Sequence, residues 1–188
     1  MKGVIFNLLE EVVRRSYGED TWDRLLEATR LEGSYTSLGT YPDEELGRLV
    51  GAASDSLAMP SGEVLRWFGR EAIPILAERY PVFFTAHTSA RPFVRSVNKI
   101  IHPEVRKIYA GADVPTFDLE DGPDGALLMG YHSVRRLCAL AEGFVEGAAG
   151  HYGETVDFQH LACMHRGDAK CVFRLSFRDG KASVGVAA

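Results

Sequence analysis

The stretch DVPTFDLEDGPDGALLMGYHSVR, residues 113–135, decides the fold class of this chain. At its centre, residues 121–125 read Asp-Gly-Pro-Asp-Gly. Clustered Gly, Pro and Asp between two short apolar runs are typical of the turn of a β-hairpin. We therefore expect strands over 113–120 and 126–135, on either side of this turn.

The region before the hairpin has the periodicity of helices. Its apolar residues recur three and four positions apart, which is the spacing of one buried helix face. Pro74 is expected to kink one of these helices, and Pro103 must start a new helix or bend another just after His102. The helices are expected over 5–17, 20–30, from 43 onward, 61–80 and 90–109.

The region after the hairpin mixes both patterns. A helix is expected over about 136–152, followed by strands over 155–164 and 169–177. The chain is therefore predicted to be an α+β protein. In it, an N-terminal helical subdomain packs on a C-terminal subdomain of helices and a four-stranded antiparallel sheet.

The length of 188 residues suits one domain with a sizeable core. We expect this domain over 1–179, with the helical subdomain over about 1–62 and the α+β subdomain over about 63–179. Residues 180–188 are small and are expected to form a flexible tail.

Composition excludes several classes of protein. The net charge of −5 argues against a nucleic-acid partner, which requires clustered excess Lys and Arg. Glu10 and Glu11 interrupt the N-terminal apolar run, which is too short for a signal sequence or a membrane span, so a cytoplasmic location is expected. The three cysteines are an odd number, which favours free thiols or metal ligands over disulfides.

Motifs of catalysis are also missing from the sequence. It has no G-x-S-x-G, Walker loop, H-E-x-x-H or glycine-rich dinucleotide motif. We therefore do not expect an enzyme.

Three polar residues alternate at the end of the hairpin. Tyr131, Ser133 and Arg135 would leave the same face of a strand, where a guanidinium and two hydroxyls suit an anionic ligand such as a carboxylate. Spacing alone favours the alternative, a solvated strand face that leads into a helix. His102 is similarly open, because a lone histidine among apolar residues is more often a core residue than a ligand.

A resemblance to a known family resolves these alternatives. Met1-Lys2-Gly3, His102-Pro103, the later Pro115 and above all Tyr131-x-Ser133-x-Arg135 resemble the haem-nitric oxide/oxygen binding (H-NOX) family, which is related to the haem sensor domain of soluble guanylate cyclase. The resemblance spans nearly the whole chain. It implies a haem b held between the two subdomains.

The resemblance also implies residue roles. His102 would be the proximal ligand of the haem iron, and Tyr131, Ser133 and Arg135 would hold the propionates. Ile5 and Pro115 stand where family members press on the porphyrin and distort it. The alternative for these two residues is plain core packing.

The distal side is expected to be apolar. Family members that bind O2 use a distal tyrosine, and Leu140 stands at its expected position. Other distal positions also lack a hydrogen-bond donor: Leu9, Ala72 and Leu76. The resemblance therefore implies a sensor that binds NO and CO but excludes O2, which needs a donor.

A second metal site is expected in the C-terminal half. Cys138, His160, Cys163 and Cys171 make a Cys3His set, which suits structural zinc. A subset of the family has a zinc site with this arrangement, and His165 is the competing ligand. The alternative is three buried thiols beside an exposed histidine. If zinc is bound, oxidation of the thiols would give the sensor a second input.

The signal is expected to pass to a separate effector, by family habit a histidine kinase or a cyclic-di-GMP enzyme. The alternative function is a zinc-stabilised protein-interaction module without haem. Binding of haem by the purified protein separates these two.

Overall fold

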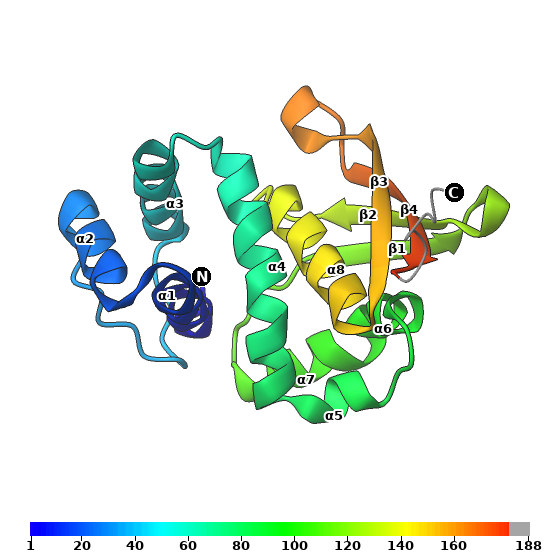
Figure 1. Cartoon of the computed structure of the whole chain (residues 1–188), viewed down its shortest axis with the longest axis horizontal. Coiled ribbons are helices and arrows are strands. Elements are labelled where there is room, and N and C mark those ends of the chain that lie inside the picture. Colours follow the sequence, from blue (N-terminus) through cyan, green and yellow to red (C-terminus); the bar gives the residue numbers. More distant parts are fainter. Residues whose placement is uncertain (181–188) are drawn as a thin grey trace, which may run out of the picture.

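The computed structural model describes residues 1–180, so the tail expected over 180–188 lies outside the described residues except for Gly180. Three helices at the N-terminus pack beside a long fourth helix, and the rest of the chain lies on the other side of that helix (Figure 1). The four helices are α1 (Gly3–Tyr17), α2 (Glu19–Thr29), α3 (Asp43–Leu57) and α4 (Ser61–Arg79). Helix α4 continues through Pro74.

The N-terminal helices share one apolar core. Phe6, Trp22 and Leu49 are each no more than 1% exposed, and Phe68 of α4 joins them. Within a single helix the buried residues recur at helical spacing, as Leu9, Val12 and Val13 do in α1, because each helix turns one apolar face inward. The N-terminal helices are thereby packed against α4, as predicted for the helical subdomain.

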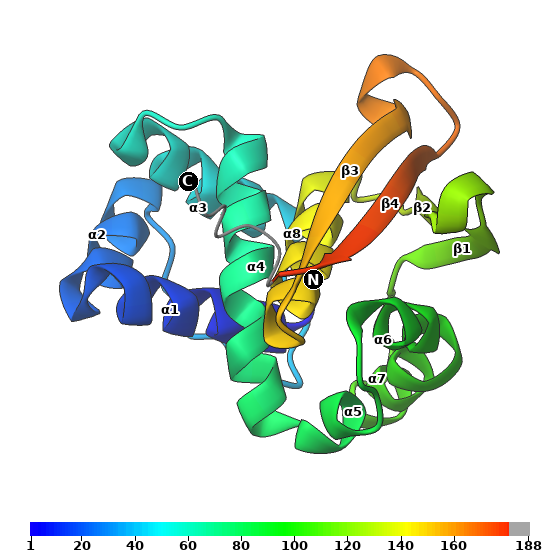
Figure 2. The ribbon, with the colours of Figure 1, turned by 45° about the vertical axis from the view of Figure 1, so that its right-hand side comes forward.

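Helix α8 (Cys138–His151) packs closely against α4 (Figure 2). Glycines allow this approach, since a Cβ atom at Gly143 would lie 2.0 Å from the carbonyl oxygen of Arg66. A Cβ atom at Gly69 would likewise lie 2.5 Å from the carbonyl oxygen of Leu140. The two helices therefore meet backbone to backbone.

The segment expected to be one helix over 90–109 is divided into three. Helix α6 (Ala90–Ser96) leads into a π-helical turn, Val97–Ile101, and then into α7 (His102–Ile108). Pro103 occupies the first turn of α7, where its missing N–H leaves no hydrogen bond unmade. A short helix, α5 (Pro81–Thr85), precedes this group.

The sheet has four strands in the order β1-β2-β4-β3, and every neighbouring pair is antiparallel. The hairpin turn is confirmed, because Asp121 pairs with Leu127 across a short helical turn, Pro123–Gly125. The fold is therefore α+β, as predicted. The strands are β1 (Thr116–Asp121), β2 (Leu127–His132), β3 (Glu154–Ala162) and β4 (Cys171–Asp179).

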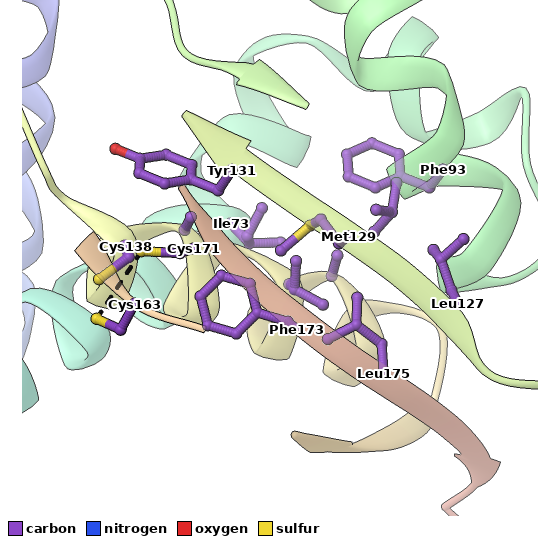
Figure 3. Packing of buried hydrophobic residues seen from close by; sticks show 14 of the residues in the cluster. Ile73, Phe93, Leu127, Met129, Tyr131, Cys138, Cys163, Cys171, Phe173 and Leu175 are labelled. Carbon is purple, nitrogen blue, oxygen red and sulfur yellow. Dashed lines mark hydrogen bonds between the residues drawn. The ribbon is translucent and has the colours of Figure 1, made fainter. Parts of the chain in front are cut away.

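One face of the sheet builds the second core. Leu127, Met129, Phe173 and Leu175 are at most 1% exposed and project from β2 and β4 toward the helices (Figure 3). Among residues 1–180, no helix combines the length and the apolar character needed to cross a membrane.

Candidate functional site

A cavity of about 360 Å³ lies between the N-terminal helices and the C-terminal half of the chain. Its wall is almost entirely apolar and comes from both halves. Its main apolar lining residues are Ile5, Leu8, Leu76, Val97, Ile101, Val105, Phe117, Met129, Leu140 and Phe144. Such a chamber suits a sizeable, mostly apolar ligand with few polar groups.

His102 projects into this cavity from the first residue of α7. Its Nδ1 atom is buried and has no hydrogen-bond partner among the described residues. Burial, helped by the charge of Arg106, lowers the pKa of the imidazole to about 4. The ring is therefore neutral at physiological pH, which is the form that ligates a metal.

The ring of His102 packs against Phe117, whose backbone is in turn held by Asn98. The two rings have their centroids 5.7 Å apart and their planes 26° apart. Asn98, in the π-helical turn, donates a hydrogen bond to the backbone carbonyl of Phe117. The sequence did not predict this π turn, a feature often found beside functional residues.

Tyr131, Ser133 and Arg135 all line the cavity, but not as one strand face. Strand β2 ends at His132, and Arg136 adopts a left-handed conformation with φ of 54°. The expectation of a strand to residue 135 was therefore wrong. Ser133 and Arg135 lie in the turn after the strand, where the Ser133 hydroxyl accepts a hydrogen bond from the Arg135 amide at 3.2 Å.

Arg135 is held at the edge of the cavity. Its Nη1 atom donates to the backbone oxygen of Asp113 at 2.8 Å and to the Asp113 carboxylate at 2.9 Å. The Tyr131 hydroxyl accepts a hydrogen bond from the Leu137 amide at 3.1 Å. The hydroxyls and the guanidinium together offer a polar rim to an otherwise apolar chamber.

The distal positions agree only in part with expectation. Ile5, Pro115, Leu76 and Leu140 line the cavity. Leu9 and Ala72 do not, and are buried in the N-terminal core instead. Their sequence neighbours Leu8 and Ile73 face the cavity, because adjacent helical residues point in directions about 100° apart.

The sequence analysis did not identify two tyrosines that line the cavity wall. Tyr80 and Tyr109 both line the cavity, and their hydroxyl oxygens lie 3.3 Å apart. Tyr80 follows Leu76 by one helical turn, so the spacing of α4 could have indicated it. Each hydroxyl has the other as a hydrogen-bond partner.

A second cluster lies where α8 meets the hairpin of β3 and β4. The ligand atoms of Cys138, His160, Cys163 and Cys171 lie within 4.8 Å of one another. Figure 3 shows the three cysteines side by side. The sulfurs of Cys163 and Cys171 lie 3.9 Å apart. His165 is turned away and its Nε2 atom lies 2.8 Å from the Arg136 carbonyl oxygen. The four residues expected from the sequence therefore converge, and His160 is the histidine beside the sulfurs.

The cluster has the chemistry of a cation site. All three cysteines are free and buried, and burial raises the pKa values of the Cys138 and Cys171 thiols. The Nε2 atom of His160 is buried without a hydrogen-bond partner among the described residues. Three sulfurs and one nitrogen are the donor types that Zn²⁺ takes in closed sites.

Comparison with known proteins gives a consistent result. The model of the haem-NO-binding family (HNOB) matches residues 2–160. An H-NOX protein from S. oneidensis, solved in the Fe(II)NO state, is 31% identical with a TM-score of 0.88, over 95% of this chain and 100% of that chain. The H-NOX from Shewanella woodyi, solved in the Fe(II)CO state, is 28% identical with a TM-score of 0.80, over 100% of this chain and 99% of that chain.

A longer curated relative matches in part. Soluble guanylate cyclase gcy-32 of Caenorhabditis elegans is 26% identical over 155 residues, which are 79% of this chain and 23% of the relative. The match thus spans about a quarter of that relative's length.

Proposed function

Since the chain belongs to the haem-NO-binding (H-NOX) family, we propose that it binds haem b in the cavity and senses nitric oxide through the iron, with His102 as the proximal ligand. The observation that carries this proposal is the neutral imidazole of His102, buried in an apolar chamber with an unpartnered Nδ1 atom. An apolar slot with one imidazole is how proteins hold b-type haem.

The polar rim supports the same cofactor. Haem carries two propionates, and Tyr131, Ser133 and Arg135 present two hydroxyls and a guanidinium at the cavity edge. Arg135 would hold a propionate as a charge-assisted hydrogen-bond donor, while Asp113 keeps its guanidinium in place. Ile5 and Pro115 would press on the porphyrin from the cavity wall.

Bound ferrous haem would supply the iron to which a diatomic gas binds. The chain's own residues would then select among gases. Leu76, Leu140 and Ile5 carry no hydrogen-bond donor, and bound O2 requires one because it gains negative charge. We therefore propose that the domain binds NO and CO and holds no stable O2.

The cavity wall offers a route for the signal. Ile5 and Leu8 come from the N-terminal helices, while His102 and Tyr131 come from the other half of the chain. A change in the iron–His102 bond would therefore act on residues of both halves, whose relative orientation is the proposed two-state element. The proposed receiver is a separate effector, a histidine kinase or cyclic-di-GMP enzyme. A cytoplasmic location stays a prediction.

The second cluster would bind zinc in a structural role. Cys138, Cys163 and Cys171 would ligate as thiolates and His160 through a ring nitrogen. The metal would clamp the start of α8 to the β3–β4 hairpin. We also propose, for the same site, that oxidation of these thiols releases the metal and affects the haem side of the protein.

Visible spectroscopy of the purified protein tests the haem proposal. The wild type, reduced without air, should give a Soret band that shifts with NO and CO and shows no stable oxy form in air. His102→Ala should lose the band until free imidazole restores it. His132→Ala is the matched control, since His132 is exposed and does not line the cavity. If the wild type shows no Soret band after haem reconstitution, the haem proposal is wrong and the alternative function, a zinc-stabilised interaction module, remains.

A further inference from the structure

The two ring nitrogens of His160 have different surroundings. Nδ1 lies 3.5 Å from the Oε1 atom of Glu142, on α8. Nε2 is buried with no hydrogen-bond partner among the described residues, and a ring nitrogen of His160 lies within 4.8 Å of the sulfurs of Cys138, Cys163 and Cys171. An imidazole can bind a metal through one nitrogen only while the other carries the proton.

We propose that Glu142 is a positioning residue of the Cys3His site: its carboxylate accepts the Nδ1–H of His160 and so presents the Nε2 lone pair to the metal. This inference rests on the proposed zinc site. A carboxylate behind a ligating histidine fixes its tautomer and ring orientation and makes the ligating nitrogen more basic. The 3.5 Å separation needs only a small adjustment to become a hydrogen bond.

The ring of His160 is already held from another side. It lies against Phe173, with centroids 4.3 Å apart and planes 30° apart. Phe173 is fully buried on β4, opposite His160 in the strand pairing. Because packing restricts the ring, the main freedom that remains is which nitrogen carries the proton, and Glu142 is the carboxylate that lies beside Nδ1.

The nearby arginine, Arg66, engages only one oxygen of the Glu142 carboxylate. Arg66, on α4, makes its close ion pair with Glu146, whereas it lies 3.8 Å from the Oε2 atom of Glu142. The Arg66 guanidinium also lies over the ring of Phe158, 5.6 Å from its centroid. Two carboxylates therefore share one guanidinium, and the Oε1 atom of Glu142 remains directed at His160.

The side chains of Glu142 and His160 are largely buried, which strengthens the interaction between them. The Glu142 side chain is only 14% exposed, and that of His160 26%. A carboxylate in such a place needs donors, and a metal-bound imidazole supplies a strong one. The same carboxylate would link the proposed metal site through Arg66 to α4. Helix α4 also lines the proposed haem cavity, at Leu76.

Zinc affinity, measured by competition with a chromophoric chelator, tests the proposal without reference to haem. Glu142→Leu, which removes the acceptor, should weaken zinc binding by about 10- to 100-fold. Glu142→Gln keeps an oxygen that can accept from Nδ1 and should recover most of the affinity. Glu146→Gln is the matched control, because it removes the closer partner of Arg66 but does not face His160, and it should change the affinity by less than about threefold.

A double-mutant cycle shows whether Glu142 acts through His160. Once His160→Ala has removed the imidazole, Glu142→Leu should cost no further affinity, because it has nothing left to position. An equal loss in both backgrounds, or wild-type affinity in Glu142→Leu, would overturn the proposal. Should Glu142→Leu not fold, the comparison of Glu142→Gln with Glu142→Asp decides: the shorter carboxylate should bind zinc more weakly, and equal affinity would overturn the proposal.

Failure of the zinc site itself has a different signature. If the wild type takes up no zinc under conditions where it folds, the proposed metal site falls, and this inference falls with it. If the wild type and Glu142→Leu bind zinc equally while His160→Ala binds it weakly, the metal site stands and only the role of Glu142 is lost.

Discussion

The Nε atom of Arg135 lies 2.9 Å from the Oδ2 atom of Asp43, the first residue of α3. The other oxygen of Asp43 accepts a hydrogen bond from the amino group of Met1 at 2.5 Å. Arg135 also lines the cavity, from the turn that follows β2. One carboxylate thus joins the N-terminal helices to the polar rim that we propose holds the propionates.

We expect Asp43→Asn to lower the free energy of unfolding by at most about 1 kcal/mol at pH 7. The effect is small because Asp43 is 41% exposed and solvent screens the pair. Burial raises the pKa of Asp43, but hydrogen bonds from the Met1 amine and Arg135 outweigh it and hold the pKa below its ordinary value. Urea unfolding at several pH values measures the difference between the two proteins.

The pH dependence has a defined sign. A carboxyl whose pKa is lower in the folded state stabilises the fold above its unfolded pKa and loses this contribution as pH falls through its folded pKa. The gap between wild type and Asp43→Asn should therefore be full above about pH 4 and close below it. Asp55→Asn, an exposed change on the same helix, is the control. A gap that stays constant down to pH 2 would contradict the ion-pair explanation.

Gly143→Ala should destabilise the protein by about 2 kcal/mol or more, because the added methyl would lie 2.0 Å from the Arg66 carbonyl oxygen and would force α4 and α8 apart. Gly150→Ala is the matched control in the same helix. Nothing lies within 4 Å of a Cβ atom there, so alanine should be neutral or stabilise by up to about 1 kcal/mol. Thermal unfolding compares them, and equal melting temperatures would mean that the helix approach is not constrained.

The sequence predicted features that local chemistry determines. The residues Asp-Gly-Pro-Asp-Gly favour a turn by their own conformational preferences, so the hairpin of β1 and β2 was predicted correctly. The end of β2 was not, because the left-handed turn at Arg136 depends on no strong local signal. Leu9 and Ala72 were expected in the cavity wall but lie in the N-terminal core. Periodicity predicts which face of a helix is apolar, but it does not predict which residues of that face line a cavity and which pack in a core.

The cluster of three cysteines and His160 shows the same limit of sequence-based prediction. The Cys3His set could be predicted because thiols are few and chemically distinctive. Glu142 could not, since acidic residues are common and its place behind His160 depends on how α8 packs against β3. Arg66 enters this group from a third element, far away in the sequence.

Leu140→Tyr should change the proposed gas selectivity, so that the protein also binds O2 stably. Leu140 is 7% exposed and lines the cavity, so a phenol there would bring a hydrogen-bond donor into a dry pocket. The reduced variant should form an oxy complex in air that the wild type lacks, as seen in its visible spectrum and O2 dissociation rate. Leu140→Phe adds the same ring without the hydroxyl and should behave like the wild type. A stable oxy complex in Leu140→Phe would show that pocket shape, not hydrogen bonding, controls O2.

Removal of the proposed zinc should loosen the joint between α8 and the β3–β4 hairpin. A strong chelator is expected to lower the melting temperature, because a metal that binds only the folded state stabilises it in proportion to the logarithm of its concentration over its Kd. Cys138→Ser should melt at the lower temperature with or without chelator, since it lacks one of the four donors.

The buried thiols give this effect a pH dependence. Burial raises the pKa of Cys138, so the metal-free thiol is protonated at neutral pH and zinc must displace its proton on binding. Zinc affinity should therefore fall as pH is lowered from 8 to 6.5, and calorimetry in buffers of different ionisation enthalpy should detect proton release. A chelator that lowers the melting temperature of Cys138→Ser as much as that of the wild type would mean that it acts elsewhere, and the cluster would then be a packed group of thiols.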